Sequence, residues 1–190
     1  MEKKLMLPVQ NNESLEEFVI GQRILINGKM YIARDQAHKR IVNMLKNKEK
    51  IPFSLSGNMI YYCGPTPPRK DGTFGSAGPT TSARMDAYTI PLMKEGLKGF
   101  IGKGDRSGEI RLACKKYKSL YLITFGGAGA YLAKRIASQK LIAFPELGPE
   151  AIYEIEVIDF PAIVAFDTRG KSIFSTSAGF SNSPFLIELQ

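Results

Sequence analysis

One segment of the sequence combines hydroxyl and cationic side chains at short spacing. Residues 78–86 read Gly-Pro-Thr-Thr-Ser-Ala-Arg-Met-Asp, so Thr80 and Thr81 stand just ahead of Arg84. We expect a helix to start at Thr80, where free N–H groups and the helix dipole favour an anion. Arg84, one turn further on, can hold a carboxylate with two nitrogens. The alternative is an ordinary helix start with a surface arginine.

A second segment places a cation where a strand meets a helix. Arg34 ends a predicted strand, Asp35 caps a predicted helix, and His38 follows three residues later. In α/β proteins such junctions often carry ligand contacts. Two plainer interpretations stay open: a surface ion pair for Arg34, and a core or capping role for His38.

A third segment sets a lysine between glycines, in the order Gly102-Lys103-Gly104. Glycine lets the backbone approach a ligand closely, although this spacing matches neither a P-loop nor a dinucleotide fingerprint. Together with Arg34 and Arg84, Lys103 would supply three cations for a dicarboxylate. The sequence offers no convincing histidine–carboxylate pair for acid–base work, so part of the chemistry would have to come from outside the chain.

The net charge of +8, from 26 basic and 18 acidic residues among 190, allows three kinds of partner. These are an anionic metabolite, an acidic subunit and a nucleic acid. Nucleic-acid binding predicts aromatic residues interleaved with cations on one surface, whereas the aromatic residues here fall mostly in apolar strand-like runs. An anionic metabolite is therefore the favoured partner.

Metal and membrane chemistry find little support in the chain itself. Cys63 and Cys114 are far apart and His38 is the only histidine, too few ligands for an iron–sulfur cluster and poor ones for structural zinc. We expect two reduced, buried thiols and no metal site. No apolar run is long enough for a membrane span, and no signal peptide is evident, so we expect a cytoplasmic protein.

The elements that must position these side chains alternate between strands and helices in the middle of the chain. Asn27-Gly28 predicts a hairpin between two strands, and residues 64–78 a long functional loop. The glycine-rich residues 126–129 are a weak phosphate-loop candidate or a site of close packing. Helices should begin near Asp35, Thr80, Thr89, Ser107 and residue 130. Gly96 should close the third of these helices, and the last should end near Ala137. Predicted strands cover residues 18–25, 29–34, 59–63, 99–102, 120–124, 154–159, 162–166 and 171–174.

This pattern predicts a mixed α/β domain with a parallel central portion and flanking helices. A 44% hydrophobic and 23% charged composition is that of an ordinary globular protein. We expect one domain over residues 1–190, with its core at about 15–174.

Several segments together resemble the β subunit of class I fumarate hydratases and L-tartrate dehydratases. The resemblance extends from about Leu15 to Phe174, and its most specific part is the run at residues 78–86. The segments that carry it are Arg34–Arg40, Tyr61–Pro67, Gly78–Asp86, Ile101–Gly104, Phe160–Ala162 and Asp167–Gly170.

The resemblance implies a swivelling β/β/α domain and a carbon–oxygen lyase that reversibly removes water from a 2-hydroxy dicarboxylate. It implies an oxygen-sensitive [4Fe-4S] cluster with three cysteine ligands and one open iron, which acts as a Lewis acid. In this family the cluster belongs to the α part. This chain would be the separate β subunit in a hetero-oligomer with α, with β–β contacts as a further option.

The resemblance also implies roles for individual residues. Arg34, Arg84 and Lys103 would bind substrate carboxylates, and Thr80 and Thr81 would line the pocket. Thr80 and Lys103 are the expected catalytic residues, with Thr80 as the base that takes the proton from C3. His38 and Asp35 would position these groups. The leading substrate pair is (S)-malate and fumarate. Tartrate or a related dicarboxylate is the alternative, and a non-enzymatic nucleic-acid-binding domain is the remaining one.

Overall fold

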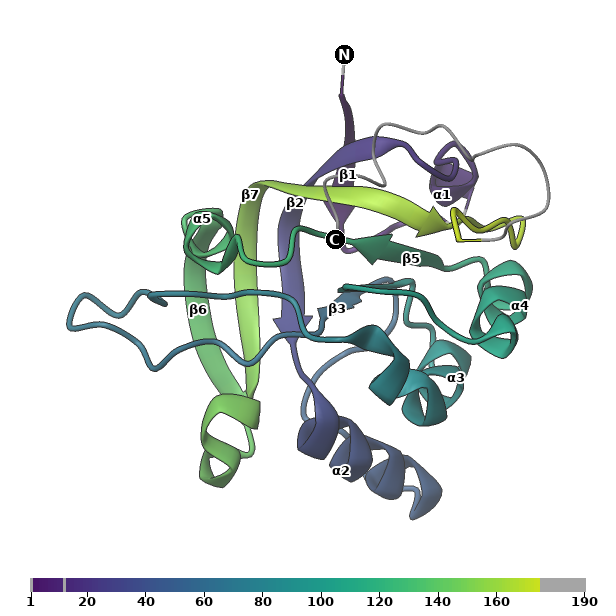
Figure 1. The fold of residues 1–190 in the computed structure, drawn as a ribbon. Helices are drawn as coiled ribbons and strands as arrows, with labels where there is room; N and C mark the ends of the chain where they lie inside the picture. The colour runs from purple at the N-terminus through teal and green to yellow at the C-terminus, as the bar shows by residue number, and fades with distance from the viewer. Residues whose placement is uncertain (1, 12, 175–190) are drawn as a thin grey trace.

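A seven-stranded mixed sheet forms the frame of the chain (Figure 1). The computed structural model describes residues 2–11 and 13–174. Its strand order is β1-β2-β3-β4-β5-β7-β6, and β2 also pairs with β7, so β2, β3, β4, β5 and β7 close into a ring. Strands β1 to β5 run parallel and β7 runs antiparallel to its neighbours. The strands are β1 Lys3–Leu7, β2 Arg23–Ile32, β3 Met59–Tyr61, β4 Gly99–Gly102, β5 Leu120–Ile123, β6 Ile136–Ala143 and β7 Ile152–Phe166.

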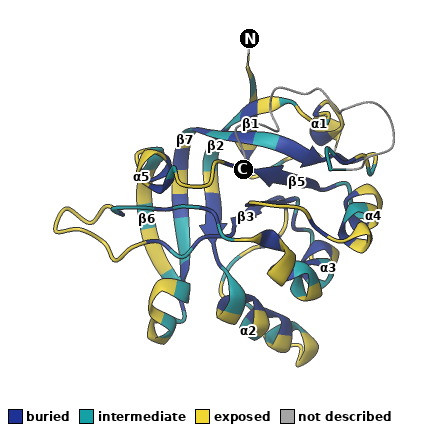
Figure 2. Ribbon diagram, viewed as in Figure 1, coloured by how far each residue is buried: buried dark blue, intermediate teal, exposed yellow. Residues whose placement is uncertain are grey.

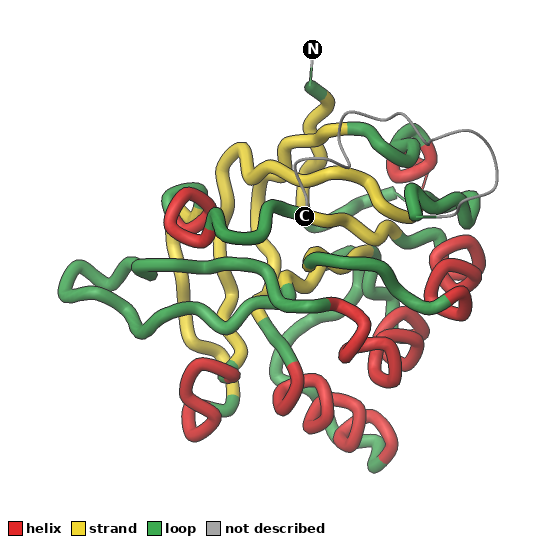
Figure 3. Tube along the Cα trace, in the orientation of Figure 1, coloured by secondary structure: helices red, strands yellow, loops and turns green. Residues whose placement is uncertain are grey.

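Three helices, α2, α3 and α4, lie side by side along one flank of this sheet (Figures 1 and 3). They follow β2, β3 and β4 in the chain, as crossover helices between parallel strands do. The predicted mixed α/β class with a parallel middle is confirmed. The helical segments are α1 Glu13–Glu16, α2 Asp35–Lys46, η1 Ser82–Met85, α3 Asp86–Lys94, α4 Gly108–Tyr117, α5 Gly129–Ala133 and η2 Pro145–Glu150.

Alternate residues of the short strands point into two separate cores. In β5, Leu120 and Leu122 belong to one buried cluster, whereas Tyr121 and Ile123 belong to a second cluster. The second cluster also holds buried residues of α2, α3 and α4, so it lies between sheet and helices. The first cluster gathers the opposite faces of the ring strands. Successive side chains of a strand point to opposite faces, and here both faces are apolar because both are covered (Figure 2).

The predicted hairpin at Asn27-Gly28 is wrong, because both residues lie inside the continuous strand β2. Gly28 has a φ of 102°, and the pairing with β7 shifts register between Ile26 and Gly28. The Asn27 side chain bonds the backbone and side chain of Asp159 on β7. The glycine signal therefore marks a β-bulge.

The predicted break between two helices at Thr89 is also wrong. One helix, α3, runs from Asp86 to Lys94 with Pro91 inside it, preceded by the short 3-10 turn η1. The Thr89 hydroxyl donates to the Met85 carbonyl oxygen one turn back, an arrangement found inside helices. Gly96, with a φ of 91°, follows the helix end as predicted.

Towards the C-terminus, two predicted strands merge and two segments differ from expectation. β7 is a single strand that bends at Asp159, which has a φ of 47°. The predicted helix up to Ala137 ends at Ala133, and the half-exposed strand β6 follows it. The predicted strand 171–174 is reduced to one bridge between Phe166 and Ser172. No helix in the described part of the chain combines the length and apolarity that a membrane crossing needs.

Candidate functional site

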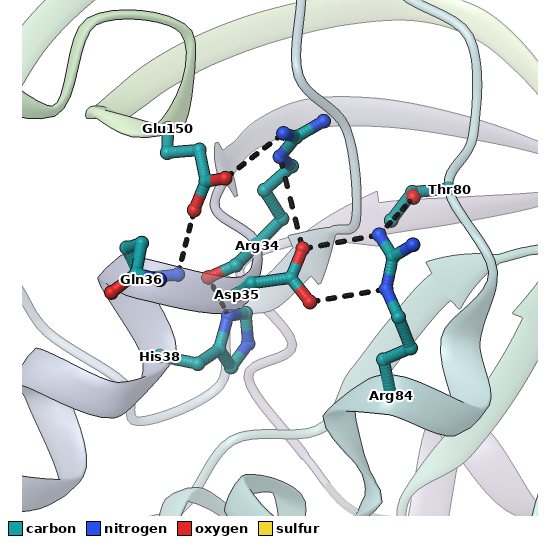
Figure 4. A network of polar contacts seen from close by, with 7 residues as sticks. All are labelled: Arg34, Asp35, Gln36, His38, Thr80, Arg84 and Glu150. Carbon is teal, nitrogen blue, oxygen red and sulfur yellow. Dashed lines mark hydrogen bonds and ion pairs between the residues drawn. The ribbon is translucent and has the colours of Figure 1, made fainter.

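Asp35 lies between two arginine side chains that come from different parts of the chain (Figure 4). Its carboxylate accepts hydrogen bonds from Nε and Nη2 of Arg84, both at 3.1 Å. Arg34 Nε lies 3.8 Å from the same carboxylate. Asp35 is the first residue of α2 and makes no side-chain cap, so its predicted capping role is wrong. The carboxylate instead joins Arg34 and Arg84 into one cluster.

Thr80 joins this cluster through its hydroxyl group. Arg84 Nη2 donates a hydrogen bond of 2.8 Å to Thr80 Oγ1. The prediction of a free N–H at Thr80 is wrong, because this amide donates to the Tyr62 carbonyl oxygen at 2.8 Å. The following helical turn, η1, starts only at Ser82. An anion at this place would therefore meet side chains rather than the amide of Thr80.

Lys103 is held beside the two threonines by backbone pairing. Thr81 and Lys103 form a parallel β-bridge. The Lys103 amide donates to the Thr80 carbonyl oxygen at 3.2 Å, and the Ser82 amide donates to the Lys103 carbonyl oxygen at 3.0 Å. The Lys103 side chain is exposed and passes Gly126, whose position would bring a Cβ atom to 4.0 Å from Cδ. The structure thus brings together the segments that carry Thr80, Thr81 and Lys103.

Arg34 has a second carboxylate partner that the sequence did not indicate. Its Nη2 donates to Glu150 Oε1 at 2.9 Å, and the other Glu150 oxygen accepts the Gln36 amide at 2.7 Å. Glu150 ends η2, more than a hundred residues further along the chain, so no local spacing could have revealed it. Gly64 gives the guanidinium room, since a Cβ atom there would lie 2.5 Å from Nη1 of Arg34.

His38 is buried behind Arg34. Its Nδ1 lies 2.8 Å from the Arg34 carbonyl oxygen, and because that oxygen can only accept, Nδ1 carries the proton. Nε2 has no partner among the described residues. Burial lowers the pKa of His38 to about 4, against a smaller raising effect of the Arg34 carbonyl. A neutral histidine that bonds the Arg34 backbone fits a positioning role better than proton transfer.

Comparison with known proteins shows which family the chain belongs to. The sequence profile of the family described as Fumarase C-terminus matches residues 2–177. The chain belongs to this family. It is 40% identical over 165 residues to Fumarate hydratase 2 of Leishmania major, covering 86% of this chain and 29% of that protein. It is 38% identical over 162 residues to the aerobic class I fumarate hydratase of Escherichia coli K12, covering 84% and 30%.

One relative is a shorter protein, and the match covers most of that protein's length. It is a Methanocaldococcus jannaschii protein named as an L(+)-tartrate dehydratase β subunit, 38% identical over 168 residues. The match covers 85% of this chain and 86% of that protein. By contrast, the chain spans only about 30% of the fumarate hydratases above. Membership of the family therefore rests on both long and short relatives.

The two cysteines of this chain do not fit the ligand set of an iron–sulfur cluster. Cys63 and Cys114 are free and buried, as predicted, and they lie in different cores. Burial raises the pKa of both thiols to about 12. The described residues hold no group of three or more histidine, cysteine or acidic side chains near one another.

Two charged residues, one within a family motif and one just after another motif, also went unassigned by sequence reasoning. Asp86 closes the 78–86 run and Arg106 follows Lys103 by three residues, and their side chains form an ion pair with Nε and Oδ1 2.7 Å apart. The sequence shows that Asp86 lies two residues after Arg84 and that Arg106 lies three residues after Lys103. It does not show that Asp86 and Arg106 pair with each other. Gly129, in the glycine-rich segment, packs closely on Gly78, which favours the packing interpretation of residues 126–129.

Proposed function

We propose that this chain is the β subunit of an iron–sulfur hydro-lyase that reversibly dehydrates a 2-hydroxy dicarboxylate, with (S)-malate and fumarate as the leading pair. The observation that carries the proposal is the convergence of Arg34, Thr80 and Arg84 around Asp35, with Lys103 paired to the adjacent backbone. Cations of this kind can hold the two carboxylates of a small substrate. The family and its named relatives agree with this reaction class.

In the proposed reaction Arg34, Arg84 and Lys103 bind the substrate carboxylates. The Thr80 oxygen takes the proton from C3, the electron pair of that C–H bond forms the C2–C3 double bond, and the C2–O bond breaks; the released hydroxide takes a proton from solvent to become water. A threonine hydroxyl is a weak acid and needs help to act as a base. Arg84 supplies part of that help, because a positive donor 2.8 Å from Oγ1 favours the deprotonated form.

The Lewis acid that would assist departure of the C2 hydroxyl is expected from another subunit. We propose that the [4Fe-4S] cluster implied by the family resemblance is held by a separate α subunit, since Cys63 and Cys114 are unsuited to hold it. The match to a protein named as a β subunit, over 86% of that protein's length, supports an assembly of α and β chains. The closed sheet with helices on one flank is compatible with a swivelling β/β/α fold in one domain, and a cytoplasmic location stays a prediction.

Tartrate is the second candidate substrate, favoured by the name of that same relative. One extra hydroxyl separates tartrate from malate, and the pocket contacts that read it would lie partly on the α subunit. Anaerobic co-expression with candidate α chains, followed by assays of malate, fumarate and tartrate side by side, decides between them. The chain purified alone should be colourless and inactive; a brown, active preparation would contradict the two-subunit proposal.

Arg84→Ala tests the site itself. Loss of a two-nitrogen contact to a carboxylate removes about 1.5–3 kcal/mol, so kcat/KM of the assembled enzyme should fall at least about 10- to 100-fold. Far-UV circular dichroism and α-subunit binding should stay unchanged, because Arg84 is exposed. Arg169→Ala is the matched control, since this arginine is also exposed and its side chain donates to the Glu16 carbonyl oxygen. Equal activity of both variants and wild type would reject the assignment of Arg84.

A further inference from the structure

The Arg106 side chain is fully buried, yet every nitrogen of its guanidinium has a partner. Nε donates to Asp86 Oδ1 at 2.7 Å, Nη1 donates to the Tyr62 hydroxyl at 3.2 Å, and Nη2 donates to Thr89 Oγ1. The exposed fraction of the side chain is 0%. A buried charge is tolerated when it is paired with an opposite charge and hydrogen-bonded, and here Asp86 is the paired charge and each of the three nitrogens donates a hydrogen bond.

The partner carboxylate uses its second oxygen as well. Asp86 Oδ2 accepts the Ser107 amide at 2.9 Å. Asp86 is the first residue of α3 and Ser107 directly precedes α4, so one carboxylate ties the starts of both helices together. Arg84 lies two residues before Asp86, and Lys103 lies four residues before Ser107. The ion pair therefore stands directly behind the two segments that carry the proposed substrate cations.

Aromatic rings enclose the guanidinium and limit its movement. The rings of Tyr62, Phe100 and Tyr121 have their centroids 5.3–5.5 Å from Arg106 Cζ. The Tyr121 hydroxyl also donates to the Gly104 carbonyl oxygen at 2.6 Å, next to Lys103. A planar fork that donates in three directions and stacks on rings cannot be replaced by lysine without loss.

We propose that the Arg106–Asp86 ion pair is a positioning device for the substrate site, which fixes the separation of Arg84 and Lys103. The inference rests on the proposed function, because those two cations are taken to hold one substrate. In front, the segments are joined by the Thr81–Lys103 bridge. Behind, the buried ion pair fixes the angle between them. Cations that bind a rigid dicarboxylate need such fixed spacing, since small displacements weaken both contacts together.

Asp86→Asn tests this positioning with little change in shape. In the assembled enzyme we expect KM for the substrate and the inhibition constant of succinate, a non-reacting dicarboxylate, to rise together at least tenfold. Arg106→Lys should do the same, and Tyr62→Phe, which removes one hydrogen bond to Arg106, should give a smaller rise. The matched control is Val164→Ala, a buried change in the first core, whereas Tyr62, Phe100 and Tyr121 around Arg106 belong to the second core. Unchanged succinate inhibition in Asp86→Asn, or an equal rise in Val164→Ala, would overturn the proposal.

Amide hydrogen exchange tests the positioning role without an activity assay, so it can fail independently of the proposed function. The Ser82 and Lys103 amides bond across the two segments, so both should exchange at least tenfold faster in Asp86→Asn than in wild type or Val164→Ala. If wild-type complex shows no hydro-lyase activity, the proposed function fails, and exchange alone decides on the ion pair. Identical exchange in all three chains would refute the positioning role. Should Asp86→Asn not fold, Tyr62→Phe gives both measurements.

Discussion

At the scale of single residues, the site is a set of cations that already hold carboxylates of their own chain. Arg84 holds Asp35, and Arg34 holds Glu150. Arg34, Arg84 and Asp35 could be chosen from the sequence because each follows or precedes a recognisable element boundary. Glu150 could not, because it reaches Arg34 only through the folded arrangement of η2 and α2.

The hydroxyl of Thr80 gives the first prediction at this scale. Thr80→Val keeps the shape of the side chain but removes the oxygen that Arg84 contacts. If Thr80 takes the C3 proton, kcat should fall about 10²- to 10⁴-fold while KM changes little, because proton transfer acts in the transition state. Steady-state kinetics of the assembled enzyme measure this. Thr80→Ser should keep most of the activity; an active Thr80→Val enzyme would assign the base to another group.

His38 gives a prediction on pH. Its pKa is lowered from 6.5 to about 4 in the folded chain, so the unfolded state binds more protons between these values. The free energy of unfolding should therefore be highest above pH 6.5 and decrease by about 3 kcal/mol as the pH falls to 4. Urea unfolding of wild type and His38→Gln from pH 4 to 7 isolates this part. Parallel pH curves for the two chains would show that His38 contributes nothing.

At the scale of elements, local sequence signals located the central strands and α4, whereas the structural role of a single glycine depended on the strands that pair around it. Strand β4 and helix α4 were placed to within about a residue, because short apolar runs and a serine before a helix are local signals. Asn27-Gly28 has the composition of a hairpin turn. In the fold, β1 and β7 pair on either side of this segment, and that information is absent from the local sequence.

The bulge yields a prediction with an internal control. A Cβ atom at Gly28 would lie 2.2 Å from the Leu7 carbonyl oxygen, whereas at Gly21 nothing lies within 4 Å, although both glycines have positive φ. Gly21→Ala should cost only the backbone strain, about 1 kcal/mol. Gly28→Ala adds a clash with the backbone of β1 and should cost roughly 3 kcal/mol in total. Urea unfolding of both variants measures the difference, and equal losses would contradict the close approach of β1.

At the scale of the whole molecule, the closure of the sheet was beyond sequence reasoning. The parallel order of the middle strands follows from alternating strands and helices. Closure depends on two pairings of β7, one with β2 and one with β5. The residues of β2 lie more than a hundred positions before those of β7, so no local signal predicts their pairing. The two cores follow from this closure, since each ring strand then has two covered faces.

The two cysteines test whether these cores open together. Cys63 belongs to the first core and Cys114 to the second. Burial raises the pKa of both thiols to about 12, so neither should react with a thiol reagent at pH 8 in the folded chain. In increasing urea, labelling of Cys63→Ala and Cys114→Ala variants should show the same midpoint after correction for their own stability. Separate midpoints would mean that the sheet interior and the helix layer unfold independently.

The carboxylates within the site also bear on how a substrate arrives. Asp35 and Glu150 offset two of the three positive charges of Arg34, Arg84 and Lys103, so the site itself has a weak field despite the net charge of +8. A dianion gains its attraction mainly at short range, by exchanging places with carboxylates already bound. Its rate of association should consequently vary little with ionic strength, unlike that of an enzyme that draws its substrate in by electrostatic steering.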